Sequence, residues 1–224
     1  MSTTLLATLL MVLGIGTAQA QYEPNTKWPY IYETFLPGAI IFEGNQKTQA
    51  ELNIHLAGNV LHYVDSRGRI MQSDERNVIR VEIGEDAYLY NGHRLMKIVA
   101  NNGTNVLLRL LRADFAAMQN SGGAYGASLN SSASSDLSSL DLGGLDQPEM
   151  GKMLQEKDEG RTIPLVENYY FIIDGKEIDA NKKAVERLIG SERAAEWKKF
   201  QKENQLKWKK EESLKQVLDF ISKQ

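Results

Sequence analysis

Residues 79–111 read IRVEIGEDAYLYNGHRLMKIVANNGTNVLLRLL, and this stretch decides the fold class that we expect. In residues 79–83, β-branched residues alternate with charged ones, which is the period of a strand with one buried face. Asn91-Gly92 and Asn102-Gly103 separate the runs that follow, and Asn-Gly accepts the positive φ angles of a tight hairpin. The stretch therefore predicts consecutive antiparallel strands, the first of which buries Ile79, Val81 and Ile83.

The strand pattern continues upstream. Residues 38–42 form a short apolar run, and residues 50–56 alternate apolar with polar side chains. Gly and Asn residues separate these runs and mark turns. We expect about eight short strands between residues 28 and 115, arranged as an antiparallel sandwich or a barrel-like domain.

Downstream, the pattern changes to one hairpin followed by helices. An aromatic and β-branched run at 169–173 meets the turn pair Asp174-Gly175, and residues 176–178 return. Three helices are expected at 182–189, 192–204 and 210–222, with Asn181 as a cap of the first. The fold class predicted from the whole chain is α+β.

Between the two parts lies a stretch of different composition. From residue 119 to 145, 13 of 27 residues are Ser or Gly, and no charged residue lies between Asp114 and Asp136. Such a stretch buries too little apolar surface to offset the entropy of ordering it. We therefore expect a β-rich domain at 21–116, a flexible linker at 117–150, and a hairpin with a helical module at 151–224.

The N-terminus has the features of an exported protein. Residues 5–15 are almost wholly apolar, and Ala18-Gln19-Ala20 follows as a small-residue cleavage site. This pattern is typical of a secretory signal peptide spanning 1–20, although no Lys or Arg precedes the apolar run. The run is too short to span a bilayer. We expect a periplasmic or secreted protein cleaved after Ala20.

The composition excludes several kinds of chemistry. The 224 residues include no cysteine, so disulfides, thiolate metal sites and a cysteine nucleophile are excluded. The net charge is −3, which argues against binding nucleic acid through overall charge. His55 and His62 flank a turn and are expected to approach each other, yet two histidines do not make a zinc site. No cofactor and no metal site is predicted.

Two groups of residues are candidates for binding. Trp28, Tyr30 and Tyr32 lie at period two, either in the core or as an exposed platform for a sugar or peptide. Residues 181–224 carry 12 Lys and Arg against 7 Asp and Glu, whereas residues 21–180 carry 14 against 22. Aromatic residues lie among the lysines of this tail, and we expect the tail to meet an acidic partner protein or envelope component. Its candidate residues are Trp197, Lys198, Lys199, Trp208, Lys209 and Lys210.

Several motifs together resemble small exported proteins of Bacteroidota-type bacteria. They are WPYIYETFLPGAIIF at 28–42, LNIH at 52–55, YVDSRGRI at 63–70, and in the tail WKKF at 197–200 and WKKEESL at 208–214. The resemblance implies a β-region with a Lys-rich helical tail and an exported location, and it implies no activity. We therefore expect a non-enzymatic envelope protein that acts as a binding or assembly module. The alternative is an envelope hydrolase or carbohydrate-active enzyme.

Overall fold

The computed structural model describes residues 30–56, 58–74, 76–114 and 164–223, and these form one antiparallel sheet and three helices. The ten strands follow the order β10-β9-β8-β7-β6-β5-β1-β2-β3-β4. The strands are β1 (Leu36–Phe42), β2 (Lys47–His55), β3 (Val60–Val64), β4 (Ile70–Gln72), β5 (Val78–Ile83), β6 (Asp86–Tyr90), β7 (Leu95–Asn102), β8 (Asn105–Ala113), β9 (Leu165–Ile173) and β10 (Lys176–Asp179). The helices are α3 (Lys182–Ile189), α4 (Ala194–Asn204) and α5 (Glu211–Ile221).

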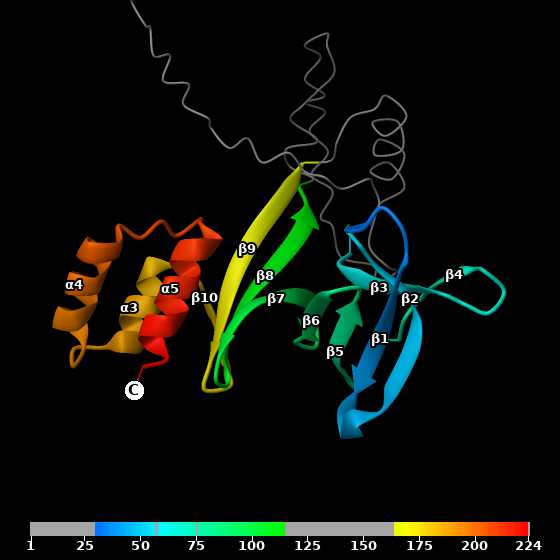
Figure 1. Ribbon diagram of the computed structural model, residues 1–224, viewed down its shortest axis with the longest axis horizontal. Coiled ribbons are helices and arrows are strands. Elements are labelled where there is room, and N and C mark those ends of the chain that lie inside the picture. Colours follow the sequence, from blue (N-terminus) through cyan, green and yellow to red (C-terminus); the bar gives the residue numbers. More distant parts are fainter. Residues whose placement is uncertain (1–29, 57, 75, 115–163, 224) are drawn as a thin grey trace, which may run out of the picture.

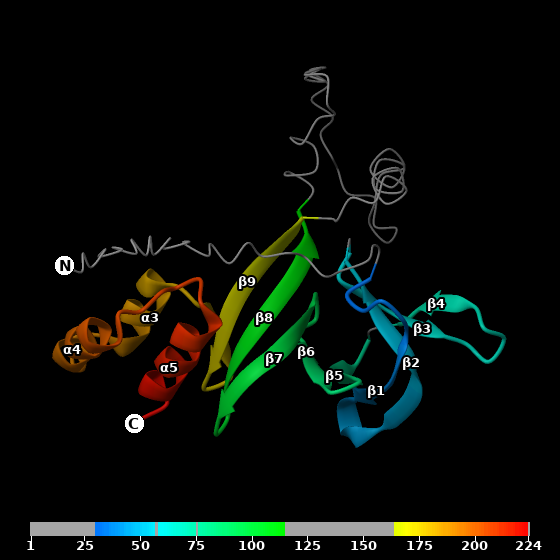
Figure 2. The same ribbon diagram turned by 45° about the horizontal axis from the view of Figure 1, so that its top comes forward.

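The predicted α+β class is confirmed, with eight strands before residue 114 and a helical module at the C-terminus. The three helices gather beside β8, β9 and β10, and β1 to β4 lie at the far end of the sheet (Figures 1 and 2). The final hairpin joins the sheet of the N-terminal part, because β9 pairs with β8 from Ala113↔Leu165 to Val106↔Ile172. Residues 117–150, where we expect the linker, lie outside the described residues.

The sheet curls without closing into a barrel. The backbone N–H of Leu95 in β7 donates to Asn59 Oδ1 at 2.6 Å, and the N–H of Ala113 in β8 donates to the carbonyl of Leu56 at 3.4 Å. These contacts bring the turn between β2 and β3 against β7 and β8, although no strand ladder joins them. The sheet therefore surrounds a core in its first half without the closed ladder of a true barrel.

The predicted burial of Ile79 is wrong, because β1 and β5 form a bulge at this position. Ile41 of β1 is opposite Arg80, but Phe42 is opposite Val78, so Ile79 has no partner in β1. An extra residue of this kind shifts the side-chain alternation. Val81 and Ile83 are fully buried as expected, whereas Ile79 is 43% exposed and Val78 takes its place in the core.

The turns follow the sequence signals in part. Asp174 and Gly175 both have positive φ, as a two-residue type I′ hairpin requires. Asn91-Gly92 instead belongs to a longer loop, in which Asn91 Oδ1 accepts the N–H groups of His93 and Arg94. Asn181 caps α3 by accepting the N–H of Ala184 at 2.9 Å, which confirms the predicted cap.

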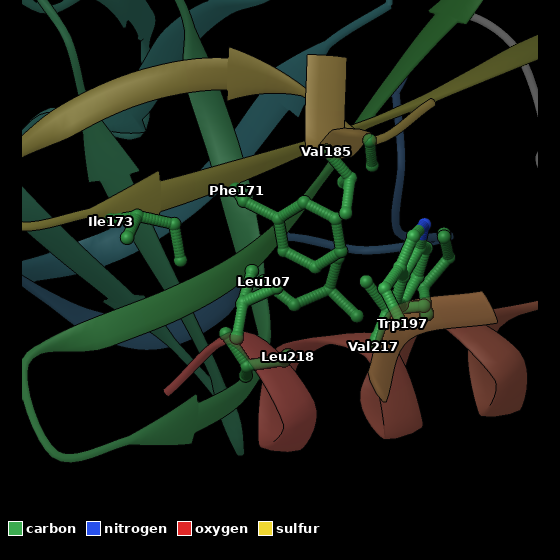
Figure 3. Close-up of a cluster of buried hydrophobic side chains, with 10 residues drawn as sticks. Leu107, Phe171, Ile173, Val185, Trp197, Val217 and Leu218 are labelled. Carbon is green, nitrogen blue, oxygen red and sulfur yellow. The ribbon is translucent and has the colours of Figure 1, made fainter. Parts of the chain in front are cut away.

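Two separate cores lie on the same side of the sheet. The first is enclosed by the curl and includes Leu52, Ile54, Val81 and Ile83. The second lies between β8, β9 and the helices, where Phe171 and Leu107 are cross-strand partners (Figure 3). The apolar stripe of α5 closes it, with four buried residues at the helical spacing of i, i+3, i+4 and i+7. They are Leu214, Val217, Leu218 and Ile221.

Among the residues that the structure describes, no helix combines the length and apolar character needed to cross a bilayer.

Candidate functional site

A groove of about 510 Å³ lies where the final hairpin meets the helices, and we call it the β9-edge groove. One wall is the first half of β9, and the other is the end of β10 with the start of α3 and the loop between α4 and α5. It is lined by Val166, Glu167, Asn168, Tyr169, Tyr170, Asp179, Ala180, Asn181, Trp208 and Lys209.

The groove exists because β10 is shorter than β9. Strand β10 has four residues against nine in β9, and it pairs only with residues 170–173. The last link is the N–H of Ala180, which donates to the carbonyl of Tyr169 at 3.0 Å. Asn181 then caps α3 and the chain leaves the sheet. The edge of β9 from Leu165 to Asn168 therefore has no strand beside it among the described residues.

The loop at residues 205–210 supplies the aromatic wall. Gln205 ends α4 in the left-handed conformation, and Ser213 Oγ accepts the N–H of Lys207 at 3.1 Å. The conformation of Gln205 and the hydrogen bond of Lys207 fix the course of the loop. Trp208 is half-buried, with its ring edge-to-face against Trp197 at a centroid distance of 6.3 Å. Its placement against the buried Trp197 holds the Trp208 indole at the groove.

A charged network includes two of the lining residues, Glu167 and Tyr169. Arg109 Nη1 lies 3.5 Å from Glu167 Oε1 and 3.7 Å from Glu211 Oε2 of α5. The Tyr169 hydroxyl donates to Glu167 Oε2 at 3.4 Å. Burial, and next the negative charge of Glu167, raise the pKa of Tyr169 to about 12, so the phenol stays protonated at neutral pH. Glu167 is thus already engaged by two groups of the protein itself.

Exposed lysines are frequent in the two segments that line the helical side of the groove. Lys182 and Lys183 occupy the first turn of α3, next to the end of β10, and Lys182 pairs with Glu186 at 3.7 Å. The loop adds Lys207, Lys209 and Lys210, all exposed. Of these five lysines, Lys209 lines the groove itself, together with two carboxylates, Glu167 and Asp179. The other four are exposed neighbours in sequence of the lining residues Asn181, Trp208 and Lys209.

The structure separates the tail candidates into two kinds. Trp197 is 2% exposed and packs in the second core, so it is a core residue that a partner does not reach. Lys198 and Lys199 are exposed on α4, where Lys199 lies 3.9 Å from Glu203. Trp208 and Lys209 line the groove, so two of the six tail candidates come together there, and the exposed Lys210 follows them in the chain.

The N-terminal candidates do not form a flat platform. Trp28 lies outside the described residues. Tyr30 is half-buried, and its hydroxyl lies 2.9 Å from His62 Nδ1. The Tyr32 hydroxyl donates to Asp86 Oδ2 at 2.7 Å and lies 2.6 Å from the Tyr88 hydroxyl. Burial and the neighbouring Tyr88 raise the pKa of Tyr32 well above its usual value. Both hydroxyls are therefore occupied by contacts within the protein.

The two histidines approach each other as expected. His55 in β2 and His62 in β3 have ring centroids 5.2 Å apart, with the Tyr30 ring edge-on to both. Burial lowers the pKa of both rings, that of His55 to about 4. In the described part of the chain, no three His, Asp or Glu side chains come together as metal ligands.

A second pocket of about 680 Å³ opens at the end of the curled sheet. Its floor is apolar, with Ile40, Phe42, Ala50 and Tyr63, and its rim contains the Arg76–Asp74 ion pair. Hydrogen bonds from Arg76 lower the pKa of the Asp74 carboxyl to about 2. Since the two charges satisfy each other, the rim presents no net charge to a ligand.

Sequence reasoning missed Glu167, Tyr169 and Tyr170 on the β9 wall of the groove and Asp179 at the end of β10. One signal was available in the sequence. The helix cap at Asn181 leaves room for only a short strand after Gly175, shorter than the strand that precedes Asp174. The fold and the groove together define an α+β protein with an open strand edge beside a basic helical module. Comparisons with protein-family models, with curated proteins and with solved structures find no match for this chain.

Proposed function

We propose that this protein is a non-enzymatic, exported protein of the cell envelope that acts as a binding or assembly module for an acidic partner. The observation that carries the proposal is a groove lined by Trp208 and Lys209, with four further exposed lysines next in sequence to its lining residues. Fixed positive charges attract an acidic partner, and an aromatic ring at the centre gives contact area at a low cost in entropy.

The way in which the helices attach to the sheet supports this use of the lysines. The apolar stripe of α5 is buried against β7 and β8, so the attachment uses apolar side chains. Lys198, Lys209 and Lys210 remain exposed and have no ion pair with another described residue. The positive charge of these three lysines is therefore available to a partner outside the chain.

The proposed location depends on residues 1–20 of the sequence. Their apolar run and their Ala18-Gln19-Ala20 site favour cleavage after Ala20 and a periplasmic or secreted mature protein. Mass spectrometry of protein recovered from the envelope fraction should show a mature N-terminus at Gln21. Recovery of the intact residues 1–20 would contradict export by this route.

Capture from envelope extract tests the binding role. The tagged mature chain should retain an acidic partner at low salt and lose it at about 0.5 M salt, because exposed charges are screened beyond a few ångström there. Reversal of Lys198, Lys199, Lys209 and Lys210 to Glu should abolish capture without unfolding the protein, since exposed lysines contribute little to stability. A control variant reverses four exposed cations outside residues 181–224: Lys47, Arg67, Arg112 and Lys176. Equal capture by both variants would contradict the proposal.

A further inference from the structure

We infer that the β9-edge groove accepts an extended, acidic segment of the partner, which adds a strand to the sheet along β9 where β10 stops. This inference rests on the proposed binding function and names the form that the partner takes. Strand addition is a common way of recognising a peptide, in which main-chain hydrogen bonds give affinity and alternate side chains give specificity.

The backbone of β9 provides the hydrogen-bonding groups. In a strand, successive residues direct their N–H and C=O groups to opposite edges. The carbonyl of Tyr169 faces β10, because it accepts the N–H of Ala180. The carbonyl of Pro164 faces β8, because it accepts the N–H of Asp114 at 2.8 Å. The backbone groups of Leu165 and Glu167 therefore point to the open edge, where an added strand continues the line of β10.

The walls of the groove select the side chains of that segment. Tyr169 and Glu167 are on the side of the sheet that faces the helices, as is Phe171 of the second core. Alternate side chains of an added strand on this side lie towards Trp208 and Lys209. An apolar or acidic residue suits this wall, and a basic one does not.

Charge decides between a partner and a second copy of this chain. Pairing two β9 edges would bring together two copies of Lys209 and of the exposed lysines in the segments beside it, and these like charges repel each other. An acidic segment meets the same lysines favourably. Of the two carboxylates in the groove, Glu167 is held by Arg109 and Tyr169, which leaves Asp179 as the one that opposes an acidic ligand.

The probe is an acetylated, amidated peptide of alternating Val and Glu, eight residues long, added to the mature full chain. Isothermal titration calorimetry measures its affinity, and amide hydrogen exchange by NMR measures protection at individual residues. Bound peptide should slow exchange at the N–H groups of Leu165 and Glu167 by at least about tenfold, because both become hydrogen-bonded. Lys209→Glu with Lys210→Glu should weaken binding at least about tenfold, and Lys202→Glu on α4 should change it less than about twofold.

N-methylation of the peptide separates strand addition from charge attraction. Two peptides carry methyl groups on alternate amides, one on all Val and one on all Glu residues. Only one of these sets faces β9, so one peptide should lose binding and the other should keep it.

If both methylated peptides bind equally and exchange at Leu165 and Glu167 is unchanged, strand addition is wrong. Suppose that in this case the peptide still binds in a salt-sensitive way and loses binding in the variant with Lys209→Glu and Lys210→Glu. That result would support an acidic partner without strand addition. If the peptide does not bind, or if sedimentation shows that the chain pairs with itself through β9, the inference is overturned. The capture experiment then judges the proposed function separately.

Discussion

His55 and His62 illustrate how a residue pair can be placed by register alone. In β2 and β3, His62 is opposite Asn53 and His55 is opposite Val60, so the two histidines are diagonal neighbours on one face. Residues 30–35 cover them, and the buried Asn53 holds this segment by donating to the carbonyls of Tyr32 and Thr34. The sequence shows both histidines beside a turn, but only the register puts their rings together.

This pair should make the stability of the protein depend on pH. Burial, with His62 adding to it, lowers the pKa of His55 to about 4, below the value of about 6.5 in an unfolded chain. As pH falls, the unfolded state therefore binds the proton first. Stability should be complete above about pH 6.5 and should fall by roughly 2 kcal/mol as pH approaches 4, allowing for partial exposure of the ring.

Urea unfolding between pH 7 and pH 4.5 measures this dependence. His55→Asn should reduce the slope of the free energy of unfolding against pH, whereas His93→Asn, at an exposed loop position, should leave the slope unchanged. A slope in His55→Asn equal to that of the unsubstituted protein would show that His55 is not the group responsible.

Among the elements, β5 shows where periodicity succeeds and where it fails. The alternation of residues 79–83 predicts the buried face at Val81 and Ile83, and the structure confirms it there. It fails at Ile79, because the bulge opposite Ile41 and Phe42 depends on the partner strand, which lies far away in sequence. The local sequence pattern predicts the alternation of buried and exposed residues within a strand. It does not predict a bulge, which depends on the pairing with the neighbouring strand.

A matched pair of substitutions tests this bulge. Val81→Asp places an unpaired charge in the first core and should destabilise the protein by several kcal/mol. Ile79→Asp makes a similar change at a position that is 43% exposed, and should cost about 1 kcal/mol or less. Thermal unfolding gives both values. Equal shifts in Tm would mean that Ile79 is buried and that the bulge is absent.

The helices were the easiest elements to predict from sequence, and the groove was the hardest. Asn181, Gly190 and the apolar stripe of α5 are local signals: the first caps α3, the second is its C-cap, and the third is buried. The groove arises from the difference in length between β9 and β10 and from the approach of residues 205–210. The second of these is a tertiary contact with no local signature, so Trp208 and Lys209 could be predicted as candidates but not as neighbours of Tyr169.

For the molecule as a whole, the pairing of β8 with β9 joins the two parts that composition separates. Leu107 of β8 belongs to the core under the helices, and Arg109 reaches Glu211 of α5. The two parts thus share a ladder of eight residue pairs, a hydrophobic core and an ion-pair network. Interfaces of this kind persist without a covalent connection.

Limited proteolysis should therefore cut the chain without separating it. The Ser- and Gly-rich residues 117–150 should be cleaved first, as their composition predicts. The two fragments should co-elute in size-exclusion chromatography and separate only in denaturant. First cleavage within residues 50–110, or separation of the fragments in native buffer, would contradict this arrangement.

The pinned ends of the connection after β8 also bear on how this protein can change over evolutionary time. Ala113 is opposite Leu165, and the Asp114–Pro164 hydrogen bond ties the chain just beyond this pair. The fold thus fixes where the connection starts and ends, and places no condition on its length. Each doubling of a flexible loop costs only about 0.6 kcal/mol. Insertions, deletions or a whole inserted domain at this site should leave the sheet intact, which makes it a natural position for acquiring new parts.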